Sequence, residues 1–137
     1  MQWTTDLETG DQTVDDQHKE IFRLVGQVLE TESQENKKEK AEAALQFLSA
    51  YVLSHFATEE ALMDECDYPN SIDHKGEHND FVHQVVEYMA LFSEEGDSMS
   101  VSDAINGLVY KWLDSHIKGS DKDLADFYKG WKLLSNV

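Results

Sequence analysis

The sequence has few residues that would interrupt a helix or cross-link the chain. It holds one proline, one cysteine and seven glycines in 137 residues. Proline and glycine are the strongest breakers of helices and strands, so their scarcity favours long helices joined by short connections. The single cysteine, Cys66, excludes an internal disulfide and permits a reducing compartment.

Basic residues and long apolar runs are also scarce. Eleven lysines and arginines stand against 28 aspartates and glutamates, a formal net charge of -17. This charge repels phosphate backbones and anionic lipids, so we expect neither nucleic acid nor a membrane as partner. The sequence shows no signal-peptide pattern and no run approaching the roughly 20 apolar residues that span a bilayer. We therefore expect one cytoplasmic domain, 1–137. Nothing in the sequence indicates its oligomeric state.

Apolar residues recur at helical spacing in four segments, which predicts an all-α protein. The predicted helices cover residues 12–32, 37–65, 71–94 and 101–117. Short connections between such helices are typical of an up-down-up-down antiparallel four-helix bundle. An N-terminal arm, residues 1–11, would rest on the bundle through Trp3 and Leu7.

A short C-terminal helix is predicted over residues 121–134. We expect the preceding helix to break at Gly119, and Ser120 to open a capping box for the new helix. His116 and Asp121 are five residues apart, which on an uninterrupted α-helix would separate them by roughly 140°. The break at Gly119 would let Asp121 turn back toward the side that His116 faces.

Histidines and carboxylates occupy the apolar faces of these helices, where an unpaired charge is costly. A lone histidine on such a face is usually a hydrogen-bonded core residue. Here, however, five of the six histidines and two carboxylates share the core faces of four helices, at matching levels in an antiparallel bundle. Only His83 falls on the outer surface. The core set is His18, His55, Glu59, His74, His78, His116 and Asp121.

The number of these side chains indicates two metal ions. Five imidazoles and two carboxylates are too many for one tetrahedral zinc site, which takes about four ligands, and imidazole with carboxylate suits iron. Two octahedral ions offer about twelve positions. Five histidines, two bridging carboxylates and a bridging solvent oxygen fill all but one, and the last could receive a small diatomic ligand.

The motifs resemble those of the hemerythrin family along essentially the whole chain. One histidine is followed by HFATE, HKGEH and HIKGSD, which match the family's HxxxE, HxxxH and HxxxxD in order and spacing. The compact length is more similar to bacterial hemerythrins than to the animal respiratory pigments.

The resemblance implies a non-haem di-iron centre with an oxo or hydroxo bridge that binds O2 reversibly. His74, His78 and His116 would ligate one iron, His18 and His55 the iron with the vacancy, and Glu59 and Asp121 would bridge both. The family's O2 pocket falls on apolar side chains that would keep the site dry: Ile21, Phe56, Trp112, Leu113 and Ile117.

Three functions follow from this set. The first is reversible O2 binding, without turnover, for storage, delivery or sensing. The second is a di-iron oxidase or peroxidase, which is disfavoured because oxidative centres of helix bundles are richer in carboxylates and use Glu-x-x-His motifs. The third is an O2-sensing domain of a larger signalling protein.

Overall fold

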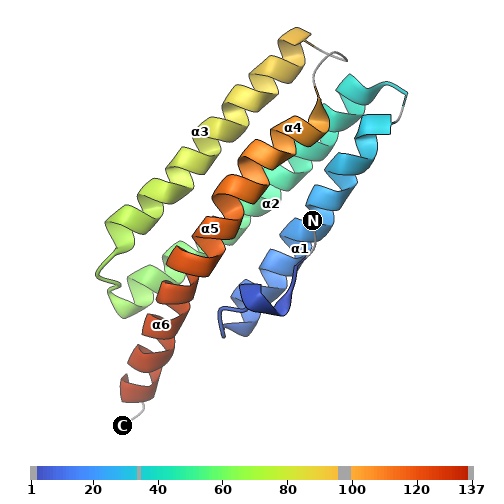
Figure 1. Ribbon diagram of the computed structural model, residues 1–137. Coiled ribbons are helices and arrows are strands. Elements are labelled where there is room, and N and C mark those ends of the chain that lie inside the picture. Colours follow the sequence, from blue (N-terminus) through green and yellow to red (C-terminus); the bar gives the residue numbers. More distant parts are fainter. Residues whose placement is uncertain (1–2, 34, 96–99, 136–137) are drawn as a thin grey trace.

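The computed structural model describes residues 3–33, 35–95 and 100–135. Three long helices, α1 (Gln12–Glu30), α2 (Lys37–Cys66) and α3 (Ser71–Glu95), come first along the chain. They are followed by one continuous helical stretch, which Figure 1 shows in orange and red. That stretch consists of α4 (Val101–Ile105), η4 (Asn106–Leu113), α5 (Asp114–His116), η5 (Ile117–Asp121) and α6 (Lys122–Ser135). For brevity we call it the fourth helix.

The helices form a closed antiparallel bundle. Helix α2 packs against α1 and α3, and the fourth helix contacts α3 through η4 and α1 through α4. Chain direction alternates from one helix to the next (Figure 1), and α6 continues beyond the α2–α3 turn. The predicted all-α bundle with a C-terminal helix is therefore confirmed. None of the described helices is both long and apolar enough to cross a membrane.

The helix ends follow from local chemistry. The Asp11 carboxylate accepts a hydrogen bond from the Val14 amide at 2.9 Å and caps α1. The hydroxyl of Ser100 accepts a hydrogen bond from the Asp103 amide at 3.2 Å and caps the fourth helix. Helix α2 ends at Asp67, whose φ of 51° is left-handed. Pro69 follows and keeps the α2–α3 connection short.

The break expected at Gly119 is wrong. Residues 114–122 stay helical, and η5 is a π-helical turn in which the Lys122 amide donates to the Ile117 carbonyl, five residues back. Ser120 does not cap a new helix, because its hydroxyl donates to the Glu77 carboxylate at 2.7 and 2.8 Å. Glycine is tolerated inside a helix at modest cost, so its presence alone does not end one.

The N-terminal arm rests on the bundle close to the start of α1. Leu7, in the 3-10 turn η1 (Thr5–Leu7), is buried in the main core, and the Lys19 ammonium lies 4.6 Å from the Trp3 ring centre. Both anchors therefore act as expected. The buried Asp15 carboxylate accepts hydrogen bonds from the Thr9 amide and hydroxyl at 2.9 and 2.7 Å. Asp15 thus ties the arm to α1.

Removing that carboxylate should loosen the arm. We expect Asp15→Ala to lower the free energy of unfolding by about 1–3 kcal/mol, because the buried Thr9 groups lose their acceptor. Urea unfolding followed by circular dichroism measures the change. Asp16→Ala is the matched control, since Asp16 is exposed and its carboxylate contacts Gln12 and Lys19 of the same helix. Equal losses in both variants would show that Asp15 has no special role.

Candidate metal centre

The structure brings all seven predicted side chains together inside the bundle. Helix α1 supplies His18, α2 supplies His55 and Glu59, α3 supplies His74 and His78, and the fourth helix supplies His116 and Asp121. Each residue is at most 3% exposed. His83, expected on the surface, is exposed.

The seven side chains form two overlapping groups in which the potential ligand atoms lie within 4.8 Å of one another. One group contains the imidazoles of His74, His78 and His116, and the other contains those of His18 and His55. Glu59 and Asp121 belong to both groups. Two positions for a metal ion, with two shared carboxylates, are therefore built into the fold.

Most Nε2 nitrogens of the five histidines lie close to a carboxylate oxygen without forming a hydrogen bond. The Nε2 atoms of four histidines lie 2.9–3.3 Å from a carboxylate oxygen of Glu59 or Asp121. None of these four nitrogens makes a hydrogen bond, and neither does either Glu59 oxygen. Buried polar atoms without partners are rare in proteins. Nitrogens that converge without bonding fit a metal ion as the missing partner.

Three histidines are held from outside by a residue of the preceding helix. His55 Nδ1 lies 2.7 Å from the Gln17 amide oxygen, and His116 Nδ1 lies 3.0 Å from Glu77. His78 Nδ1 lies 3.3 Å from Glu60. If Nδ1–H donates to these oxygens, the lone pair of Nε2 faces the centre.

These three outer partners were absent from the sequence analysis. Each is adjacent in sequence to a core residue: Gln17 to His18, Glu60 to Glu59, and Glu77 to His78. Successive residues on a helix lie about 100° apart, so the neighbour of a core residue can reach across to the adjoining helix. That adjacency is the signal that could have found them.

The π-turn explains how His116 and Asp121 meet without a break. Their Nε2 and Oδ1 atoms are 2.9 Å apart. In a π-turn the hydrogen bond spans five residues instead of four, so it absorbs one extra residue. The five-residue spacing of His116 and Asp121 in η5 therefore brings two side chains to the same face of the helix. The four-residue spacing of His55 and Glu59 has the same effect in α2.

Burial acts differently on the two carboxyl groups. Burial, followed by the charge of Asp121, raises the pKa of Glu59 well above its usual value. Burial also opposes ionisation of Asp121, but its polar contacts, first with Glu59 and then with His116, hold its pKa well below the usual value. Of the two carboxyl groups, Glu59 is therefore the one that holds a proton more readily.

The imidazoles of His55 and His78 favour the neutral form that binds metals. Burial, followed by the neighbouring imidazole of His18, lowers the pKa of His55 to about 3. Burial and His116 lower the pKa of His78 to about 2. Neutral imidazole is the form that a metal ion binds.

The side chains expected to line an O2 pocket all pack in the main core. Ile21, Phe56, Leu113 and Ile117 are buried, and Trp112 is half-buried. Two of these aromatic rings stack on imidazoles of the three-histidine group. Phe56 lies 3.8 Å from His78 between ring centres, and Trp112 lies 4.4 Å from His116.

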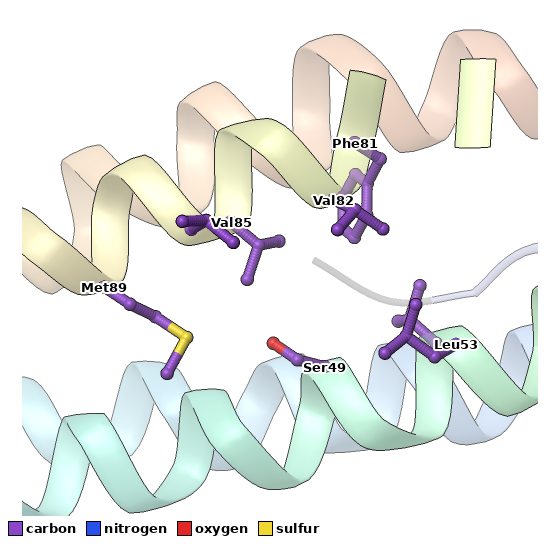
Figure 2. Close-up of a pocket in the computed structure, with 8 residues that line it drawn as sticks. Ser49, Leu53, Phe81, Val82, Val85 and Met89 are labelled. Carbon is purple, nitrogen blue, oxygen red and sulfur yellow. The ribbon is translucent and has the colours of Figure 1, made fainter. Parts of the chain in front are cut away.

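An apolar hollow of about 120 Å³ lies between α2 and α3 (Figure 2). In Figure 2, Leu53 and Ser49 of α2 face Val85 and Met89 of α3 across it. None of the seven core residues lines this hollow. One of its lining residues, Phe81, has its ring 4.7 Å from that of Trp112, which stacks on His116.

The fold and the site define a helical-bundle protein with a buried histidine and carboxylate metal centre. The model of the Hemerythrin HHE cation binding domain matches residues 9–128. The chain belongs to the hemerythrin family, whose members bind O2 at a di-iron site and are generally carriers rather than enzymes.

Relatives in bacteria and a solved structure agree with this assignment. A bacteriohemerythrin of Pseudomonas aeruginosa PAO1 is 38% identical over 125 residues, which cover 90% of this chain and 78% of the relative. One from Stenotrophomonas maltophilia is 32% identical over 127 residues, 93% of this chain and 80% of the relative. The crystal structure of a hemerythrin point mutant superposes with a TM-score of 0.81 at 28% identity, covering 93% of this chain and 96% of that one.

The π-turn gives a test of the geometry. We expect insertion of one alanine between Gly119 and Ser120 to abolish metal binding at the centre, because it would rotate Asp121 by about 100°. Metal content after purification from iron-supplemented cells measures the effect. An alanine inserted between Lys132 and Leu133, near the exposed end of α6, is the control. Full metal content in the first variant would contradict this account of the turn.

Proposed function

We propose that the seven residues hold two iron ions with a bridging oxo or hydroxo group and that the centre binds O2 reversibly. The observation that carries the proposal is the sharing of Glu59 and Asp121 by two groups of imidazoles. Histidines 74, 78 and 116 would serve one iron, and histidines 18 and 55 the other. Two ferrous ions can supply two electrons to O2 and recover them when it leaves.

The unequal groups support a vacancy at one iron. With both carboxylates shared, one ion has three imidazoles and the other has two. If both ions prefer six ligands, the ion with His18 and His55 keeps a free position. O2 would bind there.

The apolar side chains around the centre support binding without turnover. Ile21, Leu113 and Ile117 are at most 2% exposed and offer no proton to a ligand. Phe56 and Trp112 brace the imidazoles of His78 and His116 by stacking. A dry surround of this kind slows the arrival of water and protons, so bound oxygen can depart as O2.

Outside the centre, the nearest acids are already occupied. The carboxylates of Glu60 and Glu77 face the outer nitrogens of His78 and His116, away from the open position. Neither is placed to act as a general acid on a bound ligand. This arrangement favours a carrier or sensor over the oxidase alternative. Storage, delivery and sensing would all use the same centre, alone or in a larger signalling protein.

Oxygen binding can be tested by absorbance. We expect the reduced, iron-loaded protein to gain a visible absorption band on exposure to air and to lose it under vacuum, over repeated cycles. Iron content measured on the same sample gives the number of ions per chain, which should be two. A protein that holds iron but bleaches irreversibly after one exposure would favour the oxidase alternative.

The role of the apolar side chains as a barrier to water can be tested by truncating one of them. We expect Leu113→Ala to shorten the lifetime of the oxygenated form about tenfold or more, because the cavity would admit water. Decay of the visible band measures the lifetime. Leu45→Ala is the matched control, since Leu45 is equally buried but lies ten residues before His55, about 15 Å along α2. An unchanged lifetime in Leu113→Ala would exclude this residue as a barrier.

A further inference from the structure

A second cavity lies beside the centre, where the α2–α3 turn approaches η5 and α6. Its volume is about 190 Å³, well above the ~10–15 Å³ that one water molecule needs. Its lining has three carboxylates and no lysine or arginine. The lining residues are Tyr68, Asn70, Asp73, His74, Glu77, Ser120 and Asp123.

The residues that line the cavity differ in their exposure to solvent. Asp73 and Asp123 are exposed, and the side chain of Glu77 is 40% exposed. His74 is 2% exposed. Of the seven side chains of the centre, His74 is the one that lines the cavity. His74 is therefore shared by this acidic cavity and the metal centre.

The two ring nitrogens of His74 have different surroundings. Nε2 lies 3.0 Å from Asp121 Oδ1, inside the centre. Nδ1, on the opposite edge of the ring, is buried and has no hydrogen-bond partner among the described residues. In the neutral ring, Nε2–H donates to the Asp121 carboxylate, so Nδ1 presents a lone pair. An unpartnered, buried lone pair beside an acidic cavity calls for a ligand.

His74 also lacks the outer partner that three of the other histidines have at Nδ1. The rings of His55, His78 and His116 are fixed by Gln17, Glu60 and Glu77. His18 lacks an outer partner too, but it is completely buried and lines no part of this cavity. Turning the His74 ring would break no hydrogen bond at Nδ1.

The ligand that fits these groups is a divalent cation. Carboxylate oxygens with one imidazole nitrogen suit ferrous iron. Three carboxylates in a lining without lysine or arginine attract positive charge. The centre itself is sealed, because its seven side chains are at most 3% exposed. An ion must therefore cross the protein surface somewhere, and this cavity reaches within one side chain of the centre.

We propose that this cavity is the entrance through which ferrous iron reaches the centre. Asp73 and Asp123 collect the hydrated ion, and His74 holds it through Nδ1 before it passes inward. The proposal rests on the proposed iron centre, but it concerns the rate of loading and leaves the final state unchanged. Glu77 stays with Ser120 and His116 and adds negative charge to the wall.

The test measures iron uptake by the metal-free protein. Ferrous sulfate is added without oxygen, samples are quenched with a chelator at intervals, and bound iron is measured. We expect the double variant Asp73→Asn, Asp123→Asn to load about tenfold more slowly, the scale on which local charge alters association rates. Its final iron content should equal that of the wild type, because neither residue belongs to the centre.

A control with the same change in net charge separates the cavity from general attraction. Glu87→Gln, Glu94→Gln removes two exposed carboxylates of α3 that do not line the cavity. We expect it to load at the wild-type rate. Equal slowing in both double variants would contradict the proposed entrance. Loading of the Asp73 and Asp123 variant at the wild-type rate would contradict it as well. Iron uptake without a reversible oxygen band would instead overturn the proposed function and leave the entrance intact.

Discussion

The arrangement of the four helices depends on two buried carboxyl groups that need polar partners. Glu59 and Asp121 are almost completely buried, and an isolated charge in such a place costs several kcal/mol. They lie against five imidazoles, and those come from all four helices. A shift of any one helix would therefore displace at least one side chain of the centre. The polar centre fixes the relative position of the helices more narrowly than apolar packing, which tolerates many exchanges of side chains.

The outer contacts extend this constraint around the bundle. Gln17 of α1 holds a histidine of α2, Glu60 of α2 holds one of α3, and Glu77 of α3 holds one of the fourth helix. Each helix thus sets the orientation of an imidazole on its neighbour. His18 and His74 have no such outer partner among the described residues. Only at His74 does the free nitrogen border a cavity, which is why loading, in our proposal, occurs at that ring.

Much of this architecture could be predicted from the sequence, because the ligand motifs and the apolar stripes obey the same helical period. Residues such as His55 and Glu59 are visible as a pair once that period is assumed. The π-turn could not be predicted, because its extra residue looks like a break at Gly119 when spacing is measured on an α-helix. Glu77 and Glu60 were also missed, because among 28 acids only their adjacency to a core residue distinguishes them.

The π-turn has a consequence for how this sequence is compared with others. Between His116 and Asp121 the chain contains one residue more than the space requires, because η5 closes its turn over five residues. A regular α-helix would place Asp121 about 140° from His116, whereas both side chains belong to the same group of potential ligands. The preceding segment, η4, is π-helical as well. The helical phase must therefore be followed segment by segment along the fourth helix.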